Sequence, residues 1–175
     1  AEKWCFVVAG DGRSDPKAAR PMDRGGVNAT ITTEVMQAVI KEDAKFLAWT
    51  GDLVYGYQND PAAFERQLLT WRGIMQPLYD RHIGVLPCRG NHDASSKDAV
   101  RIWNKVFSGG YAQPKNGPST PGDLSWFYSR GDVLFVGLDQ YGGELEAIDQ
   151  GWFDSVLRQN PKKFVFSMGH EPAFM

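Results

Sequence analysis

Short apolar runs along the chain alternate with longer segments in which apolar residues recur every three or four positions. The runs Trp4–Ala9, Phe46–Trp49 and Val85–Cys88 are rich in β-forming residues and are followed by glycine or polar positions. These features are typical of buried strands. We therefore expect three strands in the first half of the chain.

Two amphipathic segments separate these runs. Over about 30–42, apolar residues recur at helical spacing, and Asn28 or Thr30 is available as the N-cap. The dipeptide Asp60-Pro61 predicts the start of a second helix, because Asp caps the first turn and Pro fits the first helical position. We expect Pro77 to end or kink this helix. The strand–helix–strand order predicts parallel strands with right-handed crossovers, and hence an α/β fold.

The second half of the chain shows the signals of a hairpin, two helices and a last strand. Gly131 and Asp132 separate two apolar runs and predict a hairpin turn. The other expected elements are a helix with Val100, Trp103 and Phe107 capped by Ser95 or Ser96, a helix from about Leu145 to Leu157, and a strand at Phe164–Met168.

The composition favours one folded domain over residues 1–175. The chain has 42% hydrophobic and 13% aromatic residues, enough to bury a core at this length. Its formal net charge is −2 and it contains no basic run, which gives no electrostatic basis for binding nucleic acid or an anionic membrane. No apolar stretch approaches the roughly 20 residues that a membrane helix needs. The expected partner is a small molecule, and the sequence leaves the oligomeric state open.

The first residues and the cysteines bear on the cellular compartment. A start at Ala1-Glu2 is what signal cleavage after a small residue leaves, which favours a periplasmic or secreted location. Cys5 and Cys88 both lie in apolar runs, so we expect two buried thiols, with a disulfide or a metal role as the alternatives.

Polar residues follow the predicted strands. Asp11, Asp52, the motif Gly90-Asn91-His92-Asp93 and His170 each come directly after an apolar run or its glycine. The carboxyl ends of parallel strands meet at one edge, where open α/β sheets bind ligands. Carboxylate, amide and imidazole groups are ligands of metal ions that range from hard to borderline in character. A structural zinc site is not favoured, because the sequence has no pair of cysteines at ligand spacing. A shared carboxylate suggests two ions, which can activate water for in-line displacement at phosphorus.

At these residues the sequence resembles the calcineurin-like metallophosphoesterases. The family motifs appear, in order, as Asp11, Gly51-Asp52, Gly90-Asn91-His92-Asp93 and Gly169-His170. The resemblance implies a β-sandwich flanked by helices in αββα layers. It also implies hydrolysis of phosphate mono- or diesters by a two-metal centre in which a bridging hydroxide attacks phosphorus. The cofactors would be two divalent or trivalent ions of Mn, Fe or Zn, and the substrate a small phosphate ester.

The family roles can be carried over residue by residue. The resemblance implies that Asp52 bridges the two ions, that Asp11 binds the first ion, and that Asn91 and His170 bind the second. His92 would contact the phosphoryl group and protonate the leaving alkoxide. Asp93 would hold the His92 ring and raise its basicity.

Two positions near these motifs differ from the usual family pattern. The first motif is usually Asp-x-His, but Arg13 stands in place of that His, and a guanidinium cannot ligate a metal. We interpret Arg13 as a phosphate-binding group, with a surface arginine as the alternative. The run Gly51-Asp52-Leu53-Val54-Tyr55 is similar to a motif of the purple acid phosphatases, with Tyr55 three residues after Asp52. That likeness implies a phenolate ligand to ferric iron, with a packed aromatic residue as the alternative.

The family's final Gly-His-x-His motif does not occur in the chain, which ends at Met175. We therefore expect a domain that is C-terminally incomplete, in which each ion lacks one histidine. The loops over 12–27 and 108–123 should line the substrate cleft. The alternatives to a hydrolase are a non-catalytic relative that binds metal or phosphate, and a nucleotide-binding α/β module without metal.

Overall fold

The computed structural model describes residues 3–17, 25–56, 59–143 and 147–172. Within these ranges the elements follow in the order β1 (Val7–Ala9), α1 (Ala29–Lys41), β2 (Phe46–Trp49), α2 (Pro61–Asp80), β3 (Gly84–Pro87), α3 (Ala99–Val106), the 3-10 helix η1 (Gly109–Tyr111), β4 (Trp126–Arg130), β5 (Val133–Gly137), α4 (Gln150–Gln159) and β6 (Phe164–Met168).

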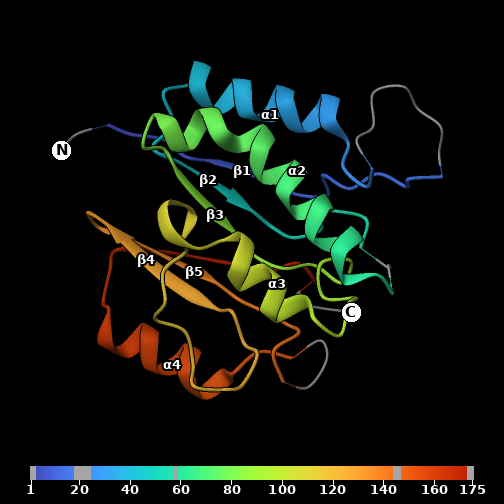
Figure 1. Ribbon diagram of the computed structural model, residues 1–175. Coiled ribbons are helices and arrows are strands. Elements are labelled where there is room, and N and C mark those ends of the chain that lie inside the picture. Colours follow the sequence, from blue (N-terminus) through green and yellow to red (C-terminus); the bar gives the residue numbers. More distant parts are fainter. Residues whose placement is uncertain (1–2, 18–24, 57–58, 144–146, 173–175) are drawn as a thin grey trace.

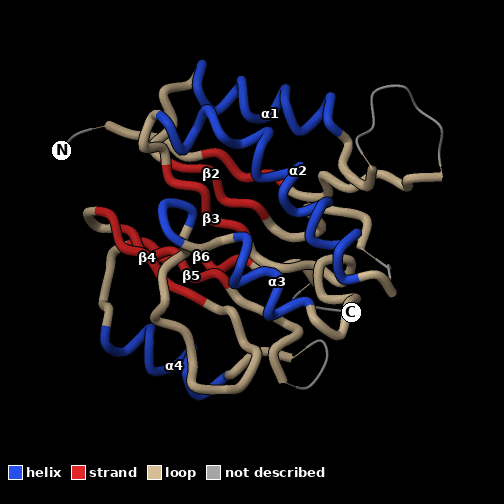
Figure 2. Tube along the Cα trace, in the orientation of Figure 1, coloured by secondary structure: helices blue, strands red, loops and turns tan. Residues whose placement is uncertain are grey.

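Two sheets face each other between layers of helices (Figure 1). β1, β2 and β3 form a parallel sheet with β2 in the centre. In the second sheet, β5 pairs antiparallel with β4 and parallel with β6. α1 and α2 cover the outer face of the first sheet, and α4 covers that of the second (Figure 2). The α/β sandwich with αββα layers is thereby confirmed.

Capping residues start the first two helices as predicted. Asn28 caps α1 by accepting a hydrogen bond from the backbone N of Ile31 (3.2 Å), and Asp60 caps α2 ahead of Pro61. Of the two outcomes expected at Pro77, an end of α2 is wrong, because the helix continues to Asp80. Pro77 lacks the backbone N–H that would bond to the carbonyl of Gly73, and Met75 and Leu78 on either side of it are buried in the core.

The starts of α3 and α4 differ from the expectation. Asp98, and neither Ser95 nor Ser96, occupies the N-cap of α3. α4 is capped by Asp149, whose carboxylate accepts a hydrogen bond from the backbone of Trp152 at 2.8 Å. The helix therefore begins later than predicted, and Leu145 lies outside the described residues.

Three apolar clusters join the layers. The largest packs the helices α1, α2 and α3 onto the first sheet and includes Trp49 and Trp71. A second lies between the sheets, where the rings of Phe46 on β2 and Phe135 on β5 are 4.6 Å apart between centroids. The third packs Val156 of α4 against β5. Contacts between the two sheets thus fix the position of the strand ends of one sheet relative to those of the other.

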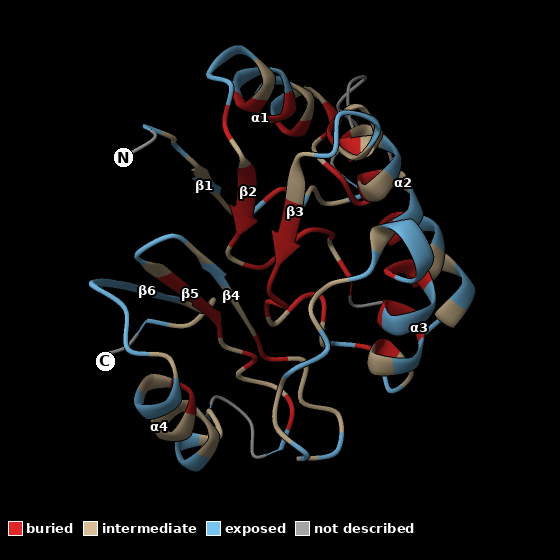
Figure 3. Cartoon of the chain, turned by 90° about the vertical axis from the view of Figure 1, so that its left-hand side faces the viewer, coloured by how far each residue is buried: buried red, intermediate tan, exposed pale blue. Residues whose placement is uncertain are grey.

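β1 and β6 lie on the same side of the sandwich, each at the edge of its sheet (Figure 3). The expectation of a buried strand at Trp4–Ala9 is corrected, because β1 begins only at Val7 and Val8 is 54% exposed. The extent predicted for β6 is confirmed, although Phe164 is 51% exposed. An edge strand has a neighbour on one side only, so an apolar sequence there does not guarantee burial.

The two cysteines have different surroundings. Both are free thiols, but Cys5 is exposed and only Cys88 is buried as expected. Cys5 precedes β1 at the open side of the first sheet, which explains its exposure. None of the described helices is long and apolar enough to cross a membrane.

Candidate metal centre

Side chains from both sheets meet where β1, β2, β3 and β6 end. Asp11 and Asp52 follow the parallel strands β1 and β2, and His170 follows β6 of the other sheet. One carboxylate oxygen from each aspartate and one ring nitrogen of His170 lie within 4.8 Å of one another. The structure therefore brings three of the predicted ligands together.

The backbone at two of these residues adopts an unusual conformation. Asp11 has φ 54° and Asp52 has φ 53°, in the left-handed region that residues other than glycine seldom occupy. Such conformations concentrate at functional sites. Gly51, with φ 98°, brings the end of β2 close to His170, since a Cβ there would lie 2.6 Å from Nδ1 of His170. The turns after β1 and β2 thus bring the side chains of Asp11, Asp52 and His170 close to one another.

The imidazole of His170 is held between a backbone carbonyl and two side-chain oxygens. Nδ1 lies 2.9 Å from the carbonyl oxygen of Thr50 and donates a hydrogen bond to it, which assigns the tautomer. The lone pair of Nε2 then faces Oδ1 of Asn91 at 3.1 Å and Oδ1 of Asp52 at 3.4 Å. A cation bound among these electron-rich atoms would relieve their repulsion. This donor set of imidazole, amide and carboxylate fits a metal ion.

His92 also approaches the Asp52 carboxylate. Its Nε2 lies 3.8 Å from Oδ2 of Asp52, and its backbone N donates to Oδ1 of the same carboxylate at 3.0 Å. The ring Nδ1 is hydrogen-bonded to the carbonyl of Tyr55. The expectation that Asp93 holds this ring is therefore corrected: the ring is oriented by the backbone of the loop that follows β2.

Asp93 organises the backbone around the motif. Its buried carboxylate accepts hydrogen bonds from the backbone N atoms of Gly90 (2.9 Å), Leu53 (3.1 Å) and Val54 (3.3 Å). Burial raises the pKa of Asp93 to about 7, and Asp52 acts in the same direction, whereas the backbone hydrogen bonds oppose the shift. These contacts tie the end of β3 to the end of β2 and leave Asp93 engaged with amides instead of with an imidazole.

Arg13 contacts both aspartates of this cluster, and Tyr55 lies beside His92. Nε of Arg13 is 2.7 Å from Oδ2 of Asp52 and 3.9 Å from Oδ1 of Asp11. The Arg13 side chain is 40% exposed, whereas that of Asp52 is 1% exposed. The ring of Tyr55 lies 5.4 Å from that of His92 between centroids. Arg13 thus reaches both the ligand cluster and solvent.

Three further residues contribute to the site without having been assigned to it from the sequence. Arg89 and Asp139, each 2% exposed, form a buried ion pair, and Gln140 accepts a hydrogen bond from the backbone N of His170 at 2.8 Å. Neither Arg89 nor Asp139 is singled out by the motifs in the sequence. Their only sequence signal is position, because Arg89 directly precedes Gly90 and Asp139 lies just after a predicted strand.

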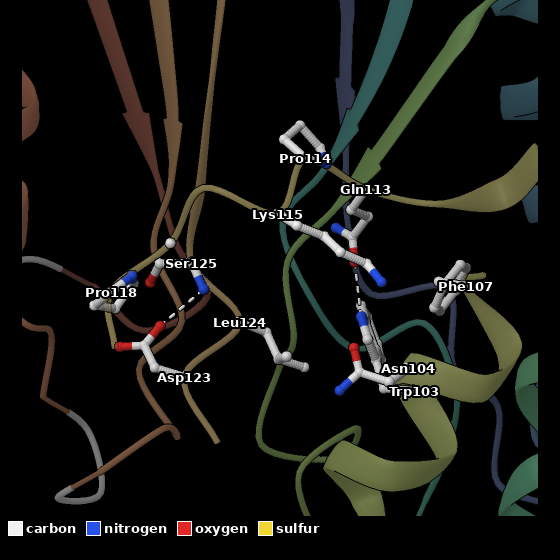
Figure 4. A pocket seen from close by; sticks show the side chains of 11 residues that line it. Trp103, Asn104, Phe107, Gln113, Pro114, Lys115, Pro118, Asp123, Leu124 and Ser125 are labelled. Carbon is white, nitrogen blue, oxygen red and sulfur yellow. Dashed lines mark hydrogen bonds between the residues drawn. The ribbon is translucent and has the colours of Figure 1, made fainter. Parts of the chain in front are cut away.

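A pocket of about 230 Å³ opens between α3 and the loop over 113–125 (Figure 4). Trp103 and Phe107 form its apolar wall, and Lys115 and Asp123 add opposite charges on the loop side. The loop over 108–123, which we expected to line the substrate cleft, contributes to this pocket, whereas none of the predicted ligands does. Much of the other expected loop, over 12–27, lies outside the described residues.

Comparisons with known proteins support the family and the fold. A family model described as "Calcineurin-like phosphoesterase" matches residues 25–174. Among solved structures, the chain is similar to a dimetal phosphatase from Danio rerio, with a TM-score of 0.54 and 16% identity, over 89% of this chain and 52% of that one. The chain thus spans about half the length of that structure, and a likeness at this identity concerns the fold alone. No curated protein matches the chain.

Proposed function

Because the chain belongs to the calcineurin-like phosphoesterases, we propose that it carries out metal-dependent hydrolysis of phosphate mono- or diesters. The observation that carries this proposal is the convergence of donor atoms from Asp11, Asp52 and His170 within 4.8 Å. Carboxylate and imidazole ligands at such spacing suit Mn, Fe or Zn. The nearby amide of Asn91 extends the same donor set.

We assign two ion positions that share Asp52. Asp11 and Tyr55 would complete the first position, and Asn91 and His170 the second. The second assignment is supported by the distance of 3.1 Å between Nε2 of His170 and Oδ1 of Asn91. The first requires Arg13 to leave Oδ2 of Asp52, where its guanidinium supplies the positive charge in the present arrangement.

The remaining side chains would act on the substrate. When bound, the ions would supply Lewis-acid activation of water and neutralise charge on the phosphoryl oxygens. His92 has Nδ1 occupied by the Tyr55 carbonyl, so its Nε2 is the atom that would protonate the leaving alkoxide. The Arg13 side chain reaches solvent. Its guanidinium would leave the Asp52 carboxylate and donate charge-assisted hydrogen bonds to a phosphate oxygen of the substrate instead.

The charge of the site explains why cations are needed for this reaction. Asp11 and Asp52 lie side by side and would repel a phosphate ester. Bound divalent ions reverse the local field, so that an anion is attracted. The proposed substrate is therefore a small phosphate ester that enters after the metal ions.

The proposal is tested by hydrolysis of p-nitrophenyl phosphate and bis-p-nitrophenyl phosphate, with Mn²⁺ added and then removed by a chelator. We expect turnover that depends on Mn²⁺ and a kcat that falls by about 100- to 10,000-fold in His92→Ala, the magnitude typical of a lost general acid. Asp52→Asn should lower both turnover and bound metal. His82→Ala is the matched control, because His82 is an exposed turn residue, and we expect it to leave turnover unchanged.

The outcome separates the hydrolase from its alternatives. Stoichiometric metal without turnover would support the non-catalytic relative. Turnover that persists in the presence of chelator, or in His92→Ala, would contradict the mechanism. A protein that binds nucleotide but no metal would instead support the module without metal.

A further inference from the structure

Two of the proposed ligands to one ion come from different sheets. Asn91 follows β3 of the first sheet, and His170 follows β6 of the second. Their side chains nevertheless meet at 3.1 Å. The clusters between the sheets are apolar, and apolar contacts are not directional. Something more specific has to hold the two loops at ligand distance.

Asp139, just beyond β5, is bonded to the loop that carries Asn91. Its carboxylate receives two contacts from Arg89, Nε to Oδ1 at 3.3 Å and Nη2 to Oδ2 at 2.5 Å. It also accepts hydrogen bonds from the backbone N atoms of Leu124 at 2.7 Å and Tyr141 at 3.2 Å. Arg89 immediately precedes Gly90 and Asn91. A buried ion pair with its hydrogen bonds satisfied fixes geometry more strictly than apolar packing does.

Gln140, the next residue, is bonded to the loop that carries His170. Its Oε1 accepts hydrogen bonds from the backbone N atoms of His170 and Glu171, both at 2.8 Å, and its Nε2 donates to the carbonyl of Glu171 at 3.3 Å. Gly169 fits closely against this amide, since a Cβ there would lie 2.7 Å from Oε1 of Gln140. The backbone that presents the His170 ring is therefore clamped at consecutive positions.

We propose that Asp139 and Gln140 are positioning residues that set the separation of Asn91 and His170, and through it the affinity for the metal ion. This inference rests on the proposed function, because it assumes that Asn91 and His170 are ligands. Neither Asp139 nor Gln140 touches the ion or the substrate. The dipeptide Asp139-Gln140, just beyond β5, thus holds both the loop that carries Asn91 and the loop that carries His170.

The test measures binding of Mn²⁺ by isothermal titration calorimetry. We expect Gln140→Ala to raise the Kd for Mn²⁺ by about 10- to 100-fold, the range found when groups that orient metal ligands are removed. Gln140→Glu keeps an oxygen acceptor for the two backbone N atoms but loses the donor to the carbonyl of Glu171, so its Kd should lie between those of the wild-type protein and Gln140→Ala. Co²⁺ absorption in the visible range gives a second readout, because a displaced ligand changes the spectrum.

Gln113→Ala is the matched control. Gln113 is also partly buried and has hydrogen bonds from Nε1 of Trp103 at 2.7 Å and to the carbonyl of Pro87, which also accepts a hydrogen bond from Nε1 of Trp126 at 3.2 Å. We expect Gln113→Ala and Gln140→Ala to lower the melting temperature of the metal-free protein by similar amounts. The Kd of Gln113→Ala for Mn²⁺ should equal that of the wild-type protein.

Three outcomes would overturn the inference. They are an unchanged Kd in Gln140→Ala, an equal rise in Gln113→Ala, and no binding of Mn²⁺ by the wild-type protein, which would remove the proposed metal centre as well. A protein that binds Mn²⁺ with the expected dependence on Gln140 but hydrolyses no ester supports the inference and contradicts only the proposed activity.

Discussion

β2 and β6 are both short apolar strands that deliver a carboxylate or an imidazole to the same cluster, yet their surroundings are opposite. All four residues of β2 are buried, because β2 has a strand on each side, helices over one face and the second sheet over the other. β6 has one neighbour, and Phe164, Val165 and Phe166 are 51%, 45% and 44% exposed. The comparison shows that local sequence specifies a strand, whereas the position in the sheet decides how far that strand is buried.

The largest expected effect is the difference in stability between two variants, each of which loses one phenylalanine: Phe46 of β2 or Phe164 of β6. Phe46→Ala should lower the free energy of unfolding by about 3–5 kcal/mol, because it leaves a cavity in the core between the sheets. Phe164→Ala should lower it by about 1 kcal/mol or less, since half of that ring already contacts water. Urea denaturation of both variants measures the difference. Equal losses would show that β6 is as well covered as β2.

A second large effect concerns the ion pair that joins the loops after β3 and β5. Arg89→Met leaves the Asp139 carboxylate buried without its charge partner and should cost about 3–5 kcal/mol of unfolding free energy. The double variant Arg89→Met with Asp139→Leu should regain part of that stability, because no unpaired carboxylate remains, although the backbone N atoms of Leu124 and Tyr141 lose their acceptor. We expect the Kd for Mn²⁺ to be higher than that of the wild-type protein in both variants.

Lys105→Met provides the control for this pair, because Lys105 pairs with Glu65 at the surface. We expect a change of about 1 kcal/mol or less. If Mn²⁺ affinity returned together with stability in the double variant, the pair would serve stability alone.

A smaller effect is expected when a charge is placed on the exposed strand. Val165→Lys should change the free energy of unfolding by about 0.5 kcal/mol or less, because Val165 is already 45% exposed. It should also slow aggregation, since a lysine on an edge strand disfavours pairing with another chain. Light scattering on heating measures this. Gln37→Lys adds the same charge on the exposed side of α1, and an equal delay there would show that net charge and not the edge is responsible.

The smallest effect distinguishes the two cysteines and leaves stability unchanged. Burial raises the pKa of the Cys88 thiol to about 12, so the reactive thiolate is scarce at neutral pH. Iodoacetamide should therefore modify the exposed Cys5 and leave Cys88 intact in the folded protein, and both should react in urea. Peptide mass analysis identifies the modified site. Rapid labelling of Cys88 under native conditions would mean that the core between the sheets opens readily.

Local patterns predicted much of this fold because the causes are local. The cap Asp60 and the extent of β6 were predicted from adjacent residues and are confirmed, and of the two candidate caps of α1, Asn28 and Thr30, the structure uses Asn28. The exposure of Val8 was not predicted, since it depends on which strand lies at the edge of the sheet. The continuation of α2 past Pro77 was not predicted, because the local rule for proline does not include the burial of Met75 and Leu78 on either side of it.

The site shows the same division between local and distant causes. The strand-end positions of Asp11, Asp52 and His170 follow from motif spacing, and these residues do converge. The support of the His92 ring by the Tyr55 carbonyl could not be predicted, because a backbone atom carries no sequence signature. Gln140 was overlooked for a related reason: its partners are backbone N atoms of a loop 30 residues away.

The hydrogen bond from His170 to the carbonyl of Thr50 spans 120 positions of the chain. Contacts of such long sequence separation form late in folding, because the entropy of closing the loop is lost before the contact is gained. We therefore expect the ligand cluster to assemble only after both sheets have docked. Capture of a metal ion by the nascent chain would then be disfavoured, and the bound ion would mark a chain that has completed its folding.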